Sequence, residues 1–139
     1  MKKLTFFLVV AVMFTLVGCG SKSSEAEAVL GDVIDITIAF ADNLEKASDA
    51  SGVAAAIDQY TADMKKMIPR IKEMQAKYPD LDMKGGKLPD EFKEFDGKFT
   101  DMNAKMMKAF TKAASYMSDP KVLKAQQDMV NAMMELTKK

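Results

Sequence analysis

The feature that most constrains the fold is an unbroken apolar stripe between residues 53 and 78. Its members recur at alternating spacings of four and three residues, and they are Val53, Ile57, Tyr60, Met64, Met67, Ile71, Met74 and Tyr78. A period of about 3.5 residues is typical of helices that pack in a left-handed bundle. We therefore predict an amphipathic helix over residues 52–77.

Pro69 lies inside this predicted helix. A proline removes one backbone hydrogen bond and normally kinks a helix, at a cost of about 3 kcal/mol in a regular one. The stripe stays in phase on both sides of Pro69. We predict one kinked helix, and the alternative is a break near residue 69.

Three further segments show the same kind of stripe, and we predict helices over residues 25–47, 89–117 and 120–137. Ser24 and Glu27 form a capping box before the first, and Asp119 and Pro120 occupy the N-cap and N1 positions of the last. The stripes are Val29, Val33, Ile36, Phe40, Leu44 and Ala47; Phe92, Phe95, Phe99, Met102, Met106, Ala109, Ala113 and Met117; and Val122, Gln126, Met129, Met133 and Leu136.

The connections between these segments are short, long and short. Residues 48–52 and 118–119 are turns, whereas residues 79–89 contain two prolines and paired glycines and form one long loop. No segment alternates as a strand does. The sequence therefore predicts an all-α fold for residues 25–139, an antiparallel up-down-up-down four-helix bundle.

The N-terminal segment has the pattern of a secretory signal peptide, residues 1–18. Lys2 and Lys3 precede an uncharged apolar run, Leu4 to Val17, and a small residue, Gly18, follows it. The run is about 14 residues long, shorter than the roughly 20 that span a bilayer as a helix.

Leu16-Val17-Gly18-Cys19 resembles the lipobox of bacterial lipoproteins. The resemblance implies that the Cys19 thiol receives a diacylglyceryl group, that cleavage occurs before Cys19, and that the new amine is acylated, for example with palmitate. Two or more acyl chains give stable membrane anchoring, whereas one holds only marginally. The alternative is an ordinary signal peptide that ends near Cys19.

Residues 19–24 would then be the lipidated cysteine and a short polar tether. In the enterobacterial sorting pattern, Asp after the cysteine retains a lipoprotein in the inner membrane, and here that residue is Gly20. The resemblance therefore implies the outer membrane, and we favour its periplasmic face over the cell surface. We expect the membrane to be bound through Cys19, with an envelope protein as a candidate partner.

Charge and composition exclude several function classes. The chain has 20 basic and 20 acidic residues, and removal of Lys2 and Lys3 leaves 18 against 20, a net charge near −2. This balance argues against nucleic acid as a partner. The chain has no histidine and one cysteine, which excludes Ser-His-Asp and Cys-His catalytic sites. We predict a non-enzymatic binding or structural module of the cell envelope, without a cofactor.

Methionine supports an alternative function, the binding of Cu(I) or Ag(I). Thioethers are soft ligands, and the candidate ligands lie on the last two predicted helices: Met102, Met106, Met107, Met129, Met133 and Met134. Most of these positions also belong to the apolar stripes, and methionine fills bundle cores well. Core packing is therefore the competing and favoured interpretation, and Met107 and Met134 lie at the edges of the stripes.

Two other metal sites are disfavoured. Asp80, Asp82, Gly85 and Glu91 fit an EF-hand loop frame, but a cation, Lys84, occupies a ligand position. The helix lengths and loop order also resemble those of small periplasmic b-type cytochromes. That family ligates haem with a methionine early in its first helix and a histidine late in its fourth. Because this chain has neither residue there, the resemblance implies the fold and not haem binding.

Overall fold

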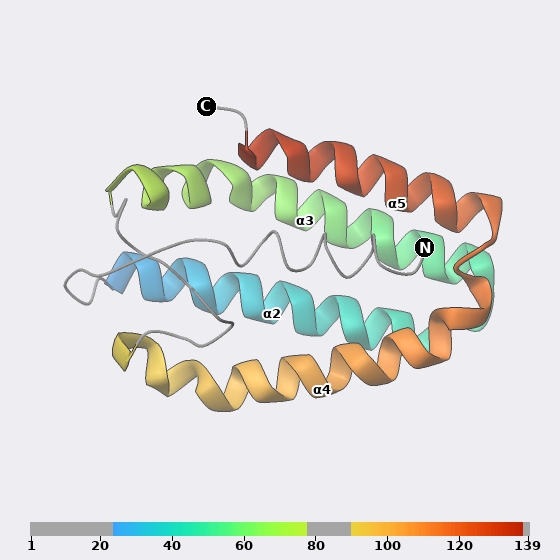
Figure 1. Ribbon diagram of the computed structural model, residues 1–139, viewed down its shortest axis with the longest axis horizontal. Helices are drawn as coiled ribbons and strands as arrows, with labels where there is room; N and C mark the ends of the chain where they lie inside the picture. The colour runs from blue at the N-terminus through green and yellow to red at the C-terminus, as the bar shows by residue number, and fades with distance from the viewer. Residues whose placement is uncertain (1–23, 78–89, 138–139) are drawn as a thin grey trace.

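The computed structural model of the chain describes residues 24–77 and 90–137, and every regular element in these residues is helical (Figure 1). The α-helices are α2 (Ser24–Lys46), α3 (Ala50–Lys77), α4 (Asp96–Ala113) and α5 (Pro120–Met133). Three 3-10 segments flank them, η2 (Asp90–Phe95), η3 (Ala114–Tyr116) and η4 (Met134–Thr137). The predicted all-α four-helix bundle is confirmed.

The turn between α2 and α3 is tighter than the sequence predicted, and α3 begins at Ala50 rather than Gly52. Asp49 caps this helix: its Oδ1 accepts a hydrogen bond from the Gly52 amide at 2.7 Å, and its carbonyl oxygen accepts one from the Val53 amide. A Cβ atom at Gly52 would come within 3.2 Å of the Ala47 Cβ. A larger residue at this position would therefore require Ala47 to shift by a few tenths of an ångström.

The continuity of the second helix through Pro69 and the capped start of the last helix are confirmed, the kink at Pro69 stays a prediction, and two helix predictions are adjusted. α3 continues through Pro69, whose side chain is exposed, and Asp119 caps α5 by accepting a hydrogen bond from the Lys121 amide at 2.9 Å. The segment predicted as one helix over residues 89–117 is 3-10 at both ends and α-helical only over α4. Likewise, the segment 120–137 ends in the 3-10 turn η4.

Interhelical ion pairs define the directions of the helices. Lys77 pairs with Glu25 and Arg70 with Asp32, so the end of α3 meets the start of α2 and the two helices are antiparallel. Lys98 pairs with Asp35 at 3.5 Å and Lys105 with Asp42 at 2.7 Å. Both of these pairs join residues 63 positions apart, so α4 runs parallel to α2. The colours in Figure 1 show the same directions.

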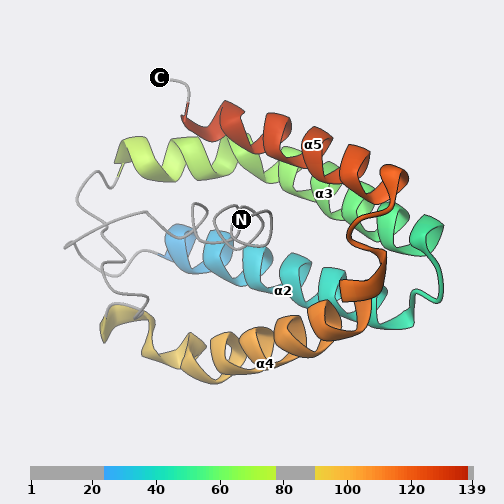
Figure 2. The same ribbon diagram turned by 45° about the vertical axis from the view of Figure 1, so that its right-hand side comes forward.

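The helices lie in the spatial order α4, α2, α3, α5 (Figures 1 and 2). α2 packs against both α3 and α4, and α5 packs against α3. Within the described residues, α4 and α5 do not pack along their lengths, although only residues 117–119 separate η3 from α5. The long connection therefore places α4 beside α2 instead of beside the helix that precedes it.

The number of neighbours explains how wide a face each helix buries. α4 has one main neighbour and buries a narrow seam, Met102, Met106, Ala109 and Ala113. α2 lies between two neighbours and buries a broader face that includes Val29, Ile34, Thr37, Phe40, Ala41 and Leu44. The predicted α2 stripe is accordingly off centre: Ile34 is fully buried, whereas Val33 and Ile36 are only partly buried.

Candidate functional site

The predicted lipidation residue, Cys19, lies outside the described residues, as do the tether residues 20–23 and the part of the EF-hand frame at residues 80–85. The α2 helix begins at Ser24, five residues after Cys19. A chain of five residues reaches at most about 17 Å when fully extended. A group attached at Cys19 is therefore restricted to the neighbourhood of the end of the bundle where α2 begins.

The six candidate methionine ligands fall into two classes. Met102, Met106, Met129 and Met133 are buried, with exposed fractions between 1 and 7%. Met107 and Met134 are exposed, at 70 and 50%. The buried four occupy the core seams of α4 and α5, as the core interpretation of the stripes predicts.

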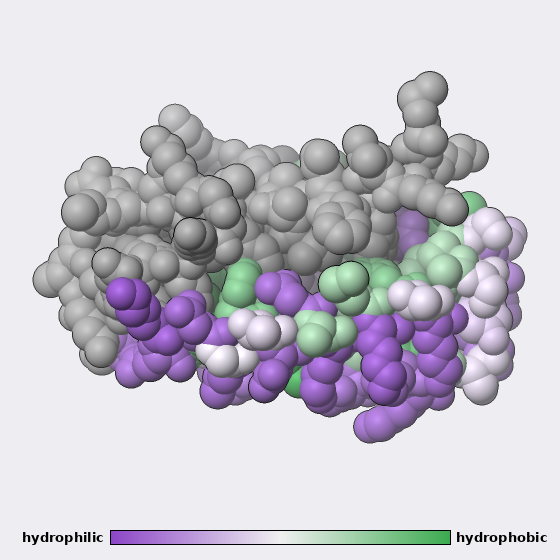
Figure 3. All heavy atoms as spheres, turned by 60° about the horizontal axis from the view of Figure 1, so that its bottom comes forward, coloured by the Kyte–Doolittle hydropathy of each residue, from purple (hydrophilic) through white to green (hydrophobic). Residues whose placement is uncertain are grey.

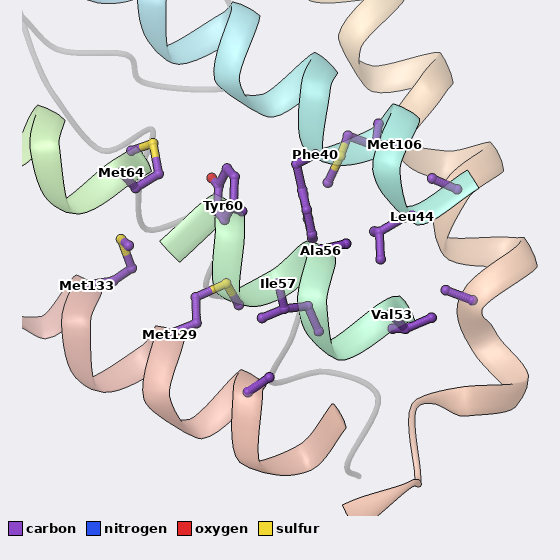
Figure 4. Close-up of a cluster of buried hydrophobic side chains, with 14 of the residues drawn as sticks. Phe40, Leu44, Val53, Ala56, Ile57, Tyr60, Met64, Met106, Met129 and Met133 are labelled. Atoms are coloured by element: carbon purple, nitrogen blue, oxygen red, sulfur yellow. The ribbon is translucent and has the colours of Figure 1, made fainter. Parts of the chain in front are cut away.

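The two seams are separated by a pair of aromatic rings. Phe40 from α2 and Tyr60 from α3 stack with their ring centroids 4.5 Å apart. Figure 4 shows Met106 on the Phe40 side of this pair, while Met64, Met129 and Met133 lie on the Tyr60 side. The structure therefore does not bring the six predicted ligands together. Met64, which was not among them, lies on the same side of the aromatic pair as Met129 and Met133.

Two further thioethers act as hydrogen-bond acceptors. Arg70 Nη1 donates to Met67 Sδ at 3.5 Å, and Gln126 Nε2 donates to Met117 Sδ at 3.1 Å. Gln126 is the one polar residue in the predicted stripe of the last helix. Its contact with Met117 shows how a polar side chain is accommodated there, at the junction of α4 and α5.

Tyr60 and Thr37 place polar groups in the core between α2 and α3. Tyr60 is 5% exposed and Thr37 is 3% exposed. Burial raises the pKa of the Tyr60 hydroxyl to about 12, against a smaller opposing effect of its hydrogen bond with Thr37. Thr37 Oγ1 in turn donates to the Val33 carbonyl at 2.8 Å. The phenol is therefore held in its neutral form over the ordinary pH range.

The ion pairs between α2 and α4 involve side chains to which the sequence pattern assigned no role. Lys105, Lys108 and Lys112 all reach α2: Lys105 pairs with Asp42, Lys108 pairs with the Glu45 carboxylate, and Lys112 Nζ donates to the Glu45 carbonyl. The sequence does contain a pattern for these pairs, because acids of α2 and lysines of α4 each recur at a spacing of seven. This pattern identifies a shared face only once the two helices are known to be neighbours.

Other charged side chains pair along or between helices, and these pairs shift the pKa of some of them. Hydrogen bonds to Glu25 and then Glu73 raise the pKa of Lys77. A hydrogen bond from Lys66, followed by one from Gln59, lowers the pKa of Asp63. These groups lie at the surface, so solvent screens their interactions and each contributes little to stability.

Among residues 24–77 and 90–137, no group of three or more acidic or cysteine side chains is placed to hold a metal ion. In the same part of the chain, no helix is both long enough and apolar enough to cross a bilayer. The chain matches no model of a known protein family, no characterised protein and no solved structure. In the absence of such a match, the fold alone defines the class of the protein, which is an all-α four-helix bundle.

Proposed function

We propose that the protein is a lipoprotein, held at the periplasmic face of the outer membrane by acyl groups on Cys19, and that it acts as a non-enzymatic binding or structural module of the cell envelope. The observation that carries the proposal is Leu16-Val17-Gly18-Cys19, placed directly after a basic start and an uncharged apolar run. Each buried methylene of an acyl chain contributes about 0.8 kcal/mol, so two or more chains anchor a protein stably.

The position of α2 supports a close contact between the bundle and the membrane surface. Because α2 starts five residues after Cys19, the anchored end of the bundle would lie within about 17 Å of the acylated residue. The Glu25–Lys77 pair marks this end. The two turns at residues 47–49 and 117–119 lie at the other end, and Tyr116 ties them together by donating to the Ser48 carbonyl at 2.9 Å.

The use of the charged side chains supports a binding or structural role over catalysis. The lysines of α4 and the acids of α2 face one another in consecutive pairs, and Arg70 and Lys77 of α3 pair with the other side of α2. These groups hold helices in register.

The proposal is tested by comparing the full chain with its Cys19→Ser variant in a bacterial host supplied with an alkyne analogue of palmitate. We expect the wild type to incorporate the label and to sediment with the outer membrane, and Cys19→Ser to do neither. A Ser21→Ala variant is the matched control and should behave as the wild type. Labelling that survives Cys19→Ser, or a wild type recovered without label, would contradict the proposal.

The alternative is Cu(I) or Ag(I) binding, and one observation favours it: Met64, Met129 and Met133 lie on facing sides of α3 and α5 (Figure 4). Thioethers there are soft ligands that carry no proton. Titration of the full chain with Cu(I) against a competing chelator separates the two functions. Binding tighter than millimolar that is lost in Met129→Leu would support the alternative, whereas the favoured function predicts no such binding.

A further inference from the structure

Three lysines of α4 pair with acids of α2, and the opposite flank of the helix is uncharged between residues 103 and 114. Lys98, Lys105 and Lys108 all pair with acids of α2. The opposite flank of the helix carries Asn103, Ala104, Met107 and Thr111 and is continued by Ala114, the first residue of η3, all of them exposed. Spacings of three and four place these five residues on one face of the helix. We call them the α4 neutral face.

α5 is divided in the same way. Lys121 donates to Ser51 of α3, and Lys124 pairs with Asp128 along the charged flank. The other flank carries Leu123, Gln127, Val130 and Asn131 and is continued by Met134, the first residue of η4. We call these five residues the α5 neutral face. Met107, Leu123 and Met134 are the exposed large hydrophobic residues of the described part of the chain, and all three belong to these two faces.

The two neutral faces belong to the two helices that do not pack against each other. In Figure 3, which brings α4 forward, hydrophilic side chains gather along the lower part of the surface and hydrophobic ones lie above them. Among the described residues, the main packed interfaces therefore join α2 with α3, α2 with α4 and α3 with α5, and α4 with α5 is not among them. A partner helix is the element that such an unpacked helix face accommodates.

The neutral faces match each other in charge, length and size. Neither carries a charge, so a charged partner would lose its hydration without gaining an ion pair. Asn103 to Ala114 and Leu123 to Met134 each span 11 residue steps, or about 17 Å of helix. The α4 neutral face offers small residues, Ala104, Thr111 and Ala114, whereas the α5 neutral face offers the bulkier Leu123, Val130 and Met134.

We propose that a second copy of this chain docks on this surface, with the α4 neutral face of each copy packed against the α5 neutral face of the other. A two-fold dimer forms this contact twice, since each copy contributes both faces. The inference goes beyond the proposed function and does not depend on lipid at Cys19. The labelling and fractionation tests give their result whatever the oligomeric state, so the two proposals fail separately.

The test is photo-crosslinking of the full chain in cells, with a photoreactive amino acid at position 107. We expect an adduct of twice the chain mass that contains only this protein. Position 62 on α3, where Ala62 is also exposed, is the matched control and should give no such adduct. An adduct with a different protein at position 107, no adduct there, or an equal yield from position 62 would overturn the proposal.

A substitution in the partner face gives a second test. With the photoreactive residue at 107, Leu123→Lys should lower the adduct yield by about tenfold or more, because an unpaired ammonium would be buried against a neutral face. Ala62→Lys should leave the yield unchanged. Leu123 is 48% exposed, so the variant should keep the wild-type melting temperature. An unchanged yield in Leu123→Lys would overturn the proposal even if position 107 crosslinks.

Discussion

At the scale of single residues, the core between α2 and α3 is organised around an aromatic pair with a polar edge. Phe40 stacks on Tyr60. The ring of Phe110 in α4 contacts the Phe40 ring edge to face, with the two ring centroids 6.4 Å apart. The Tyr60 hydroxyl is satisfied by Thr37. Because the hydroxyl is buried, the pKa of Tyr60 is higher than that of an exposed tyrosine.

Stability should fall at alkaline pH in a way that depends on Tyr60. Its pKa is about 12 in the folded chain and 10.0 for an unperturbed tyrosine. The neutral phenol therefore contributes fully below about pH 10, and the contribution is lost as the pH rises towards 12. Between these values, unfolding free energy should drop by about 1.4 kcal/mol per pH unit more in the wild type than in Tyr60→Phe. Urea unfolding measures this, and equal slopes would refute it.

The buried methionines should behave as core residues. Met129 is 1% exposed and Met64 is fully buried. Met129→Leu keeps the volume and should cost less than about 1.5 kcal/mol, whereas Met129→Ala leaves a cavity and should cost about 2–5 kcal/mol. The exposed Met107 is the matched control, and Met107→Ala should change stability by at most about 0.5 kcal/mol. A large loss in Met129→Leu would mean that its sulfur has a role beyond packing.

At the scale of the helices, the capping residues predicted where a helix begins, and the apolar spacing predicted which face it buries. The predicted helix lengths were less accurate. The Ser-Asp-Pro junction predicted the α5 start because an N-cap carboxylate and a proline at N1 both act locally. The stripe predicted the burial of α3 as far as Ile71. The 3-10 segments around α4 were not predicted, since spacing does not distinguish a tightened terminal turn from a regular one.

Loss of the α5 cap should weaken the bundle measurably. Asp119 accepts the hydrogen bond of the Lys121 amide, and Leu123 donates its own amide to the Asp119 carbonyl at 2.9 Å. Asp119→Ala removes the side-chain acceptor and should cost about 1 kcal/mol, within a range of 0.5–2. Asp128→Ala, which removes an exposed carboxylate from the middle of the same helix, should cost less. Thermal unfolding compares them, and the reverse order would contradict the assigned cap.

At the scale of the whole molecule, the arrangement of neighbours is what the sequence did not predict. The short turn at residues 47–49 makes α2 and α3 antiparallel neighbours, as expected. The long connection between α3 and α4 allows α4 to pack on either of them. α4 packs on α2 and forms ion pairs with it, such as Lys105–Asp42. The seven-residue repeat of these acids and lysines indicates a shared face only once α2 is known to be the neighbour of α4.

Charge exchange tests this parallel pairing of α2 and α4. Lys105→Asp alone sets two carboxylates together and should destabilise the bundle by about 0.5–1 kcal/mol at low salt. The double variant Asp42→Lys with Lys105→Asp restores an ion pair and should recover most of that loss. The effect should shrink in 1 M salt, where the screening length is about 3 Å. Additive effects of the two substitutions would mean that these residues are not neighbours.

We propose that the bundle is held at the membrane by acyl groups on Cys19, and the mass of the membrane-extracted protein is the sharpest test of this anchorage. We expect a chain that begins at Cys19, with a diacylglyceryl group on its sulfur and an acyl group on its amine. Tandem mass spectrometry of the N-terminal peptide would locate both. A chain that still begins at Met1, or that carries an unmodified Cys19 thiol, would contradict lipid anchorage.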